Sequence, residues 1–464
     1  MQKHFTNVLL YQKTKMKCQF FQLLRNKLIL LLPRIKMMTL KNQKKMRNHS
    51  DIEQKYAFAK EKFETIGVNV DAALAQLQAI SLSLHCWQTD DVTGFENTNS
   101  QLSGGIQATG NYPGKARTID EVRQDISKVK ELLPGDHRLS LHAIYGDFSG
   151  KKVDRDQIEP EHFQSWIDWA KEKNLKLDFN STSFSHPKSG DQTLSHRDKG
   201  IRDFWIEHTV RSRRIADEMG RQQGSKACHN LWVHDGQKDI TVDRFLYRSY
   251  LKESLDQIFA HKFDYVKDSV ECKLFGTGLE SFTAGSHEFY LGYAVQNQIM
   301  ATLDMGHFHP TEEIYDKISS LLLFLPELML HVSRPIRWDS DHVVILNDSV
   351  IMLAQEIVRA NALNRVNIGL DYFDASINRI GAYVIGVRAT QKAILQALLE
   401  PIQLLRTYEA NGQYFERLAL LEEVKALPWA DIYDYFCYKN NVAVGIDFIS
   451  EIEDYEKQIT SKRN

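Results

Sequence analysis

The sequence predicts an α/β protein, a (β/α)8 TIM barrel with an additional C-terminal helical extension. Two observations predict this fold: eight short apolar segments alternate with helix-like segments, and polar side chains gather where the apolar segments end. An open, doubly wound sheet is the alternative, because the spacing of strands does not prove that the sheet closes. We expect residues 1–50 to form a basic leader, residues 51–395 the barrel, and residues 396–464 the extension.

The predicted strands are short and apolar, and helix-forming sequence separates them. They cover Ser81–Trp87, Arg138–Tyr145, Leu175–Asn180, Ala227–Val233, Ser269–Phe275, Met300–Met305, Leu328–Val332 and Val366–Leu370. Amphipathic helices with Asp, Glu or Pro near their starts are predicted at Ile119–Leu133, Pro160–Lys173 and Asp203–Met219. Helical spacing also marks Asp51–Leu77 before the first strand, and Gln391–Thr407, Glu416–Val424 and Asp431–Lys457 after the last.

Charge is distributed unevenly along the chain. Residues 1–50 contain twelve Lys and Arg and no acidic residue, which leaves 46 basic against 60 acidic residues, a charge of about −14, for the remainder. An acidic body argues against nucleic acid as the ligand and suits bound divalent cations. We interpret the leader as unstructured, or as sequence upstream of the true start, with Met46 a candidate initiator.

Cysteine use and hydropathy predict a cytoplasmic protein with no membrane partner. The five cysteines are scattered, odd in number and without a C-x-x-C pair, as a reducing compartment permits. No apolar run reaches the ~20 residues that span a bilayer. The best candidate, Leu28–Pro33, has a basic flank like that of a signal peptide, but no small-residue cleavage site follows it.

Histidine and carboxylate side chains end most of the predicted strands, at the face where barrel enzymes place their sites. A single polar residue at a strand end is usually only a hydrogen-bonding group. Seven consecutive strands that end in this way predict instead that the side chains surround a cation, because otherwise they would repel one another or lie unpaired.

The types of these side chains indicate which metal they would bind. Glu271, Asp304, His331 and Asp371 offer three carboxylates and one imidazole, and His307, Asp339 and Asp341 offer two carboxylates and one imidazole. Such oxygen-rich sets favour Mn²⁺, Mg²⁺ or Co²⁺ over a tetrahedral structural zinc. Seven ligands would crowd one ion, so we expect two.

Lys273 is two residues beyond Glu271, so both side chains should point into the barrel mouth. They either form a simple ion pair or, beside a metal, the ammonium group holds a sugar oxygen and stabilises charge that develops there.

Several long runs of sequence around these residues resemble the L-rhamnose isomerase family. They are Ser83–Glu96, Gly104–Gly110, Val270–Ser281, Gly285–Phe289, Asp304–Thr311, His331–His342 and Gly369–Arg379. The resemblance extends from about Lys55 to Glu456, and only the leader lies outside it.

The resemblance implies a homotetrameric enzyme that interconverts the small sugars L-rhamnose and L-rhamnulose with two Mn²⁺ ions per subunit, one site also admitting Mg²⁺, Co²⁺ or Zn²⁺. It assigns a structural ion to Glu271, Asp304, His331 and Asp371, and a catalytic ion to His307, Asp339 and Asp341. The resemblance implies that the catalytic residues are Lys273, Asp371 and His142. It implies that the substrate-binding residues are Trp87, His142, Glu271, Lys273 and His307.

Two chemical routes can move hydrogen between C1 and C2 of the open-chain sugar. In a hydride shift the metal polarises the sugar oxygens, and Asp371 orients or deprotonates a water molecule. In an enediol route a carboxylate removes the carbon-bound proton. We favour the hydride shift, because the carboxylates are already committed to ions.

Other functions are compatible with parts of the pattern. Another aldose such as D-xylose would need the same chemistry, whereas the 6-deoxy methyl group of L-rhamnose needs an apolar wall, which Trp87, Phe95 and Phe179 could supply if they are not barrel core. A metal-dependent phosphodiesterase would require a basic track that the acidic body lacks. A non-catalytic binding barrel would not need so many metal ligands.

Overall fold

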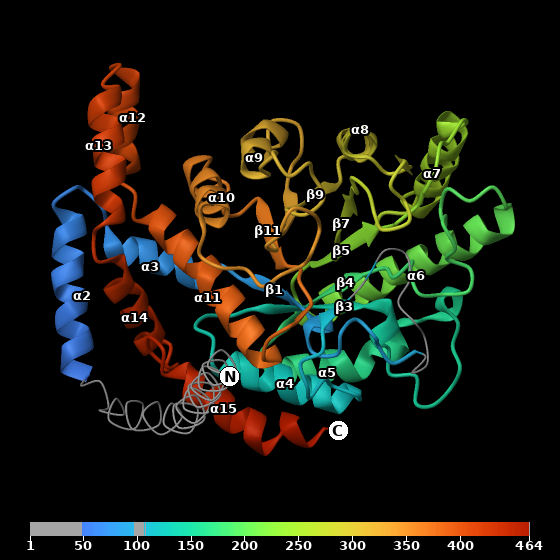
Figure 1. The fold of residues 1–464 in the computed structure, drawn as a ribbon, viewed down its shortest axis with the longest axis horizontal. Helices are drawn as coiled ribbons and strands as arrows, with labels where there is room; N and C mark the ends of the chain where they lie inside the picture. Colours follow the sequence, from blue (N-terminus) through green and yellow to red (C-terminus); the bar gives the residue numbers. More distant parts are fainter. Residues whose placement is uncertain (1–48, 97–105, 107, 464) are drawn as a thin grey trace, which may run out of the picture. The chain divides into compact units, whose positions relative to one another are not determined.

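Eight parallel strands close into a barrel in the computed structural model, which describes residues 49–96, 106 and 108–463 (Figure 1). They are β1 (Leu82–His85), β3 (Arg138–His142), β4 (Lys176–Asn180), β5 (Ala227–Trp232), β7 (Val266–Glu271), β9 (Met300–Asp304), β10 (Leu328–His331) and β11 (Val366–Leu370). Neighbours in the barrel are also neighbours in the sequence, and β11 pairs with β1 to complete the ring. The predicted closed barrel is therefore confirmed.

One α-helix follows each barrel strand in the chain. These helices are α4 (Ile119–Glu131), α5 (Gln164–Glu172), α6 (Lys199–Gln223), α7 (Arg244–Ile258), α8 (His287–Asn297), α9 (Tyr315–Leu321), α10 (Asp348–Arg359) and α11 (Arg379–Leu398). Short 3-10 helices lie in the loops, at η1 (Cys86–Gln88), η2 (Ala143–Tyr145), η3 (Arg155–Gln157) and η4 (Pro160–Phe163). None of the described helices combines the length and apolar character that crossing a bilayer requires.

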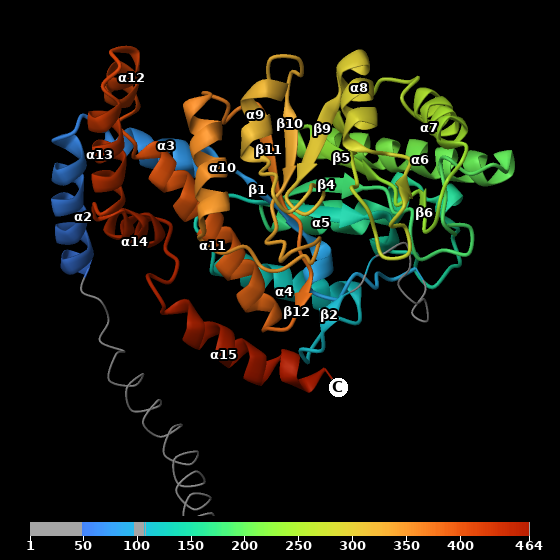
Figure 2. The same cartoon turned by 45° about the horizontal axis from the view of Figure 1, so that its top comes forward.

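Two small sheets join loops at the carboxyl ends of the barrel strands. β2 (Thr109–Gly110) pairs in parallel with β12 (Asp374–Ala375), so the segment after β1 meets the segment after β11 (Figure 2). β6 (Gly236–Gln237) pairs antiparallel with β8 (Phe282–Thr283) and connects the loops after β5 and β7.

The remaining helices lie at the two ends of the chain. α2 (His49–Glu64) and α3 (Val70–Ala79) precede the barrel; α12 (Ile402–Ala410), α13 (Tyr414–Lys425), α14 (Trp429–Lys439), α15 (Phe448–Gln458) and η5 (Thr460–Lys462) follow it. The barrel and the C-terminal helices belong to one compact unit that begins at Lys55. The predicted basic leader lies, except for its last two residues, outside the described part of the chain.

Three predicted helices are each divided in two, and each break has a local cause. Gly67, with φ of 82°, separates α2 from α3. Pro401 lies between α11 and α12, and it offers no backbone N–H to continue the first helix. Asn441 and Gly445, both with positive φ, lie between α14 and α15.

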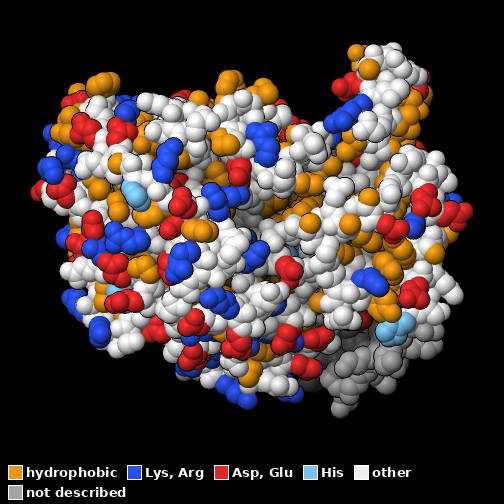
Figure 3. Space-filling view, turned by 180° about the vertical axis from the view of Figure 1, so that it is seen from behind, with side chains coloured by type: hydrophobic (Ala, Val, Ile, Leu, Met, Phe, Trp, Pro, Cys, Tyr) orange, Lys and Arg blue, Asp and Glu red, His pale blue; other side chains and the backbone are white. Residues whose placement is uncertain are grey.

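Helix α13 buries none of its residues in this chain. Its exposed apolar side chains include Phe415, 80% exposed, and Tyr414, 61% exposed. The hairpin of α12 and α13, at the upper right of Figure 3, carries hydrophobic side chains on its surface. A stable helix normally buries its apolar side chains, so the exposed apolar side chains of α13 offer a surface for a partner.

The buried side chain of His208, on α6, makes hydrogen bonds to the loop after β4 and to η3. Its Nε2 accepts a hydrogen bond of 3.0 Å from the backbone N–H of Thr182, and its Nδ1 donates one of 3.0 Å to the carbonyl of Arg155. The bond that Nε2 accepts requires the neutral imidazole, because both ring nitrogens of a protonated histidine are donors. Burial, and next the guanidinium of Arg155, lower the pKa of His208 to about 3.

We expect His208 to make folding stability depend on pH. The unfolded-state histidine binds a proton below about pH 6.5, whereas the folded one stays neutral to about pH 3, so stability is full above 6.5 and is lost as the pH falls. Between pH 7 and pH 5 the free energy of unfolding should fall by about 2 kcal/mol more in the wild type than in His208→Gln.

Urea unfolding with chelator present, at several pH values, measures this difference. His261→Gln, which changes an exposed histidine, is the matched control and should keep the wild-type pH dependence. Equal slopes for the wild type and His208→Gln would contradict the assignment.

Candidate active site and metal centre

One cavity at the carboxyl ends of the strands brings together all ten residues that were predicted to act in catalysis, substrate binding or metal binding. They are Trp87, His142, Glu271, Lys273, Asp304, His307, His331, Asp339, Asp341 and Asp371. The strand register explains the convergence, because His331 at the end of β10 pairs with Asp304 on one side and Gly369 on the other. The last side chains of neighbouring parallel strands therefore lie at the same rim of the barrel.

The first group of potential ligands consists of Glu271, Asp304, His331 and Asp371. Each offers one ligand atom, and these atoms all lie within 4.8 Å of one another. His331 Nδ1 is 2.9 Å from an oxygen of Asp371 and 3.2 Å from Oε1 of Glu271. All four residues are buried.

A second group consists of Asp304, His307 and Asp339, again with ligand atoms within 4.8 Å of one another. His307 Nε2 lies 3.0 Å from Oδ2 of Asp339, and its Nδ1 lies 3.2 Å from Oε1 of Glu271. Asp341 lines the cavity beside this group but is not part of it. Its backbone has φ of 45°, a conformation that aspartate tolerates better than most residues.

Five carboxylates in one buried space shift one another's protonation. Burial, followed by Asp339 and Asp371, raises the pKa of Asp341 well above its ordinary value, and burial raises that of Asp304 to about 7. Burial alone would lower the pKa of His331, but Glu271 and Asp371 raise it well above its usual range. Bound protons thus offset part of the negative charge of this cluster, a role that a divalent cation would take over.

A further observation supports a divalent cation as the ligand of these donor groups. Among the described residues, the buried Oδ1 of Asp339 has no hydrogen-bond partner, as expected of an oxygen that a cation would use. Carboxylates with imidazoles are suitable ligands for Mn²⁺, Mg²⁺ or Co²⁺.

Lys273 pairs with a different carboxylate from the one that its spacing suggested. Its Nζ contacts Asp339 and lies 3.0 Å from His307 Nε2, although Glu271 lines the same cavity. β7 covers Val266–Glu271, so the bounds predicted for this strand, Ser269–Phe275, were wrong, and Lys273 lies two residues beyond the strand end. Burial lowers the pKa of Lys273, but Asp339 outweighs burial and leaves that pKa above the ordinary value.

His142 and Trp87 form one wall of the cavity. Their rings stack with centroids 3.9 Å apart and planes inclined by 26°. Burial, and next the neighbouring His85, lower the pKa of His142 well below its ordinary value, so its imidazole is neutral. Its Nε2 has no hydrogen-bond partner among the described residues and can therefore meet a ligand.

His85 is a neighbour of this site that the sequence analysis missed. Its Nδ1 lies 2.9 Å from Oδ1 of Asp371, and the side chain is 1% exposed. The signal was available, because His85 is the last residue of β1 and so follows the same strand-end pattern.

The apolar wall of the cavity differs from the one suggested by sequence. Trp87 lines the cavity, but Phe95 and Phe179 do not. Phe179 packs against Phe163, with ring centroids 4.9 Å apart, as part of the core. The aromatic and aliphatic side chains that line the cavity beside Trp87 are Ile106, Phe184, Trp232 and Phe373.

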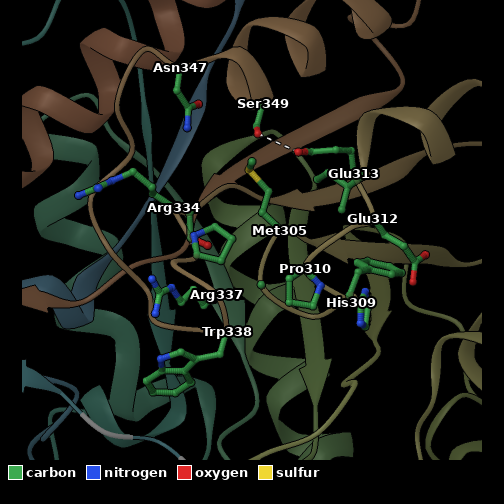
Figure 4. Close-up of a pocket in the computed structure, with 15 residues that line it drawn as sticks. Met305, His309, Pro310, Glu312, Glu313, Arg334, Arg337, Trp338, Asn347 and Ser349 are labelled. Atoms are coloured by element: carbon green, nitrogen blue, oxygen red, sulfur yellow. Dashed lines mark hydrogen bonds between the residues drawn. The ribbon is translucent and has the colours of Figure 1, made fainter.

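The loops after β9 and β10 approach each other closely at Gly306. A Cβ atom on Gly306 would lie 2.1 Å from Oδ1 of Asp339, so only glycine fits there. On their other side the same loops border a second pocket, which contains none of the ten predicted residues. In Figure 4, Trp338 and Arg337 lie at one end of this pocket, and Ser349 donates a hydrogen bond to Glu313 at the other.

We expect Gly306→Ala to lower kcat by about 10- to 100-fold, because the added methyl group displaces the carboxylate of Asp339. The side chain cannot simply rotate away, since Lys273 and His307 hold it. Steady-state kinetics on the metal-loaded enzyme measures the loss.

Gly276→Ala is the matched control. Gly276 lies in the loop after β7, and a Cβ there would meet nothing closer than 3.7 Å. Wild-type turnover by Gly306→Ala would show that Asp339 does not need this position.

The comparisons with known proteins agree over nearly the whole described chain. The family model described as L-rhamnose isomerase (RhaA) matches residues 50–463. A protein of Bacteroides thetaiotaomicron named L-rhamnose isomerase is 65% identical over 418 residues, which cover 90% of this chain and all of that protein. One of Salmonella paratyphi B with the same name is 53% identical and covers 89% of this chain and all of its own length.

Solved structures are similar at a lower level. A structure of L-ribulose 3-epimerase has 10% sequence identity and a TM-score of 0.44, and covers 70% of this chain and 98% of its own. A D-allulose 3-epimerase from Methylomonas sp. has 10% identity and a TM-score of 0.40, with 70% of this chain and 96% of that chain covered.

Proposed function

Because the chain belongs to the L-rhamnose isomerase family, we propose that its barrel cavity isomerises L-rhamnose to the ketose L-rhamnulose by a metal-assisted 1,2-hydride shift. The chain is an aldose–ketose isomerase of that family. The observation that carries the proposal is the convergence of two buried groups of carboxylates and imidazoles in one cavity.

Two divalent ions, Mn²⁺ in our proposal, would be held by these groups. Glu271, Asp304, His331 and Asp371 would hold the structural ion, and His307, Asp339 and Asp341 the catalytic one. Asp304 also lies within reach of the second group and could bridge the two sites. When bound, the ions supply Lewis acidity at the sugar oxygens on C1 and C2.

The remaining polar side chains bind and orient the open-chain sugar. Lys273 is protonated and buried, so its ammonium group can donate to a sugar oxygen and stabilise charge that develops there. Neutral His142 can accept a proton from a ring hydroxyl through its unpartnered Nε2 when the pyranose opens. Trp87, Phe184 and Phe373 offer apolar surface to the methyl group.

The direct shift of hydrogen from C2 to C1 is favoured by the composition of the cavity. All the carboxylates that line it among the described residues, namely Glu271, Asp304, Asp339, Asp341 and Asp371, are in the proposed ligand set. No uncommitted carboxylate of that lining is then left to act as the base of an enediol route. In deuterated water we expect product without solvent deuterium at C1; deuterium there would support the enediol route.

A chelator-controlled panel of aldoses tests the proposed function. Ketose formation from L-rhamnose should require a divalent ion, disappear with chelator and return with Mn²⁺. D-xylose and other aldoses should react more slowly. Turnover of L-rhamnose in excess chelator would refute the metal-assisted mechanism, and faster turnover of another aldose would change the substrate.

We further propose a homotetramer in the cytoplasm. The apolar face of α13, with Tyr414, Phe415 and Leu418 exposed, supports contacts between subunits. The four described cysteines are buried and unpaired, as a reducing compartment allows. Light scattering after size exclusion checks the assembly, and a monomer at micromolar concentration would contradict it.

A further inference from the structure

A chain of buried hydrogen bonds lies beneath the metal-binding carboxylates, inside the barrel. It begins at Ser269 of β7, passes through Thr302 of β9 and Asn230 of β5, and ends at Glu271. The oxygen atoms of Ser269 and Thr302 are 2.6 Å apart, Thr302 Oγ1 is 2.7 Å from Asn230 Oδ1, and Asn230 Nδ2 is 2.5 Å from Glu271 Oε2. All four side chains are at most 4% exposed.

The strand register places these residues together. Glu271 pairs with Thr302 across β7 and β9, and Ser269 pairs with Asn230 across β7 and β5. Ser269 and Glu271 are two residues apart on one strand, so their side chains share the inner face. Three adjacent strands therefore contribute to the chain.

The donors and acceptors can be arranged in only one way when Glu271 is ionised. A carboxylate only accepts, so Asn230 must direct its amide N–H, and not its carbonyl, towards Glu271. The carbonyl of Asn230 then accepts the proton of Thr302, and Thr302 must accept from Ser269. The threonine hydroxyl thus prevents the amide of Asn230 from turning over.

We propose that Thr302, through Asn230, is a positioning residue for Glu271, and that this relay commits one carboxylate oxygen to the protein and leaves the other to the metal. Glu271 Oε2 accepts from Asn230, whereas Oε1 faces His331 Nδ1 and His307 Nδ1, each 3.2 Å away. A carboxylate held in this way binds an ion through one oxygen in a fixed direction. Partners behind a metal ligand commonly set affinity by this means.

The inference rests on the proposed function, since it needs a metal for Glu271 to bind. Thr302 and Ser269 do not line the cavity, whereas Asn230 does. Substitution of Thr302 therefore tests the relay without removing a group that the sugar could touch.

The experiment is a titration of the metal-free full-length chain with Co²⁺, with affinity measured against a competing chelator and the ligand geometry read from the visible absorption bands. We expect Thr302→Val, which keeps the shape of threonine, to weaken the binding of one Co²⁺ by about 10- to 100-fold and to alter its absorption bands. Thr302→Ser should restore the wild-type affinity and bands. Ser269→Ala should have a smaller effect in the same direction, because Thr302 can still donate.

Ser140→Ala is the matched control. Ser140 is a buried strand hydroxyl that accepts a 2.6 Å hydrogen bond from Asn180, another asparagine of the cavity wall, and Asn180 contacts none of the proposed ligands in the described hydrogen bonds. Its Co²⁺ binding should match that of the wild type. Thermal unfolding of each metal-free variant verifies that it folds, and if Thr302→Val does not fold, Ser269→Ala decides by the same readout.

The outcomes separate the two proposals. Failure of the wild type to bind Co²⁺ would refute the metal site and, with it, the relay. Wild-type affinity and bands in folded Thr302→Val would overturn the relay alone. An equal loss in Ser140→Ala would also overturn it, because the effect would then follow from any lost hydroxyl in the barrel.

Discussion

Asp371→Asn is expected to lower kcat for L-rhamnose by about 10³-fold, within the 10²- to 10⁴-fold range typical of a lost proton-transfer group. Asp371 lies between two histidines, with oxygens 2.9 Å from His85 Nδ1 and 2.9 Å from His331 Nδ1. Burial raises the pKa of Asp371, but His85 and His331 outweigh burial and lower it well below its ordinary value, so the group is ionised. Asparagine keeps the shape and removes both the charge and one acceptor.

Metal content and thermal unfolding accompany the kinetics of this variant. The metal-free variant should unfold at a lower temperature than the wild type, because His85 and His331 lose their ionised partner. Added Mn²⁺ should stabilise the variant less than the wild type. A kcat within threefold of the wild-type value at full metal occupancy would show that Asp371 has no part in the reaction.

The barrel was predictable because its signals are local. Short apolar strands and amphipathic helices recur in order, and each strand end carries its own polar side chain, so the rim could be assembled without knowledge of contacts. The helix breaks at Gly67 and Pro401 have equally local causes, but helical spacing alone did not predict them.

Two strand-end aspartates show what local signals cannot decide. Asp178 lies near the end of the predicted strand Leu175–Asn180, yet its carboxylate accepts hydrogen bonds of 2.8 and 2.9 Å from Arg138 at the start of β3. Asp235 accepts hydrogen bonds from the backbone N–H and hydroxyl groups of Thr193 and Ser195, and so it holds the loop between β4 and α6. Both carboxylates have fixed protein partners, and those partners are 40 or more residues away in the sequence.

The partner of Lys273 was unpredictable for the same reason. Spacing places Glu271 and Lys273 on one side of the chain, but β7 ends between them and the loop after β10 brings Asp339 to the ammonium group. The strand order places β7, β9 and β10 side by side, and which of their loop side chains meet depends on the register of whole strands.

Lys273→Met is expected to lower kcat by about 10²- to 10³-fold and to change KM much less. The substitution keeps the length and apolar stem of the side chain and removes the charge, which we propose acts mainly on the sugar oxygen as negative charge develops there. The ammonium group is effective because it is buried over the ring of Trp232, 5.2 Å from the centroid, where water screens it little. Steady-state kinetics with L-rhamnose separates the two constants.

Lys267→Met provides the matched control, from the strand that precedes Lys273. Lys267 lies near the start of β7, at the opposite end of the barrel, where it pairs with Glu327 at 2.5 Å. The same chemical change there should leave kcat within about twofold of the wild type, because a partly exposed ion pair contributes little. If Lys273→Met instead raised KM with kcat unchanged, the ammonium group would bind substrate and transition state equally, and the charge would serve recognition and not the hydrogen transfer.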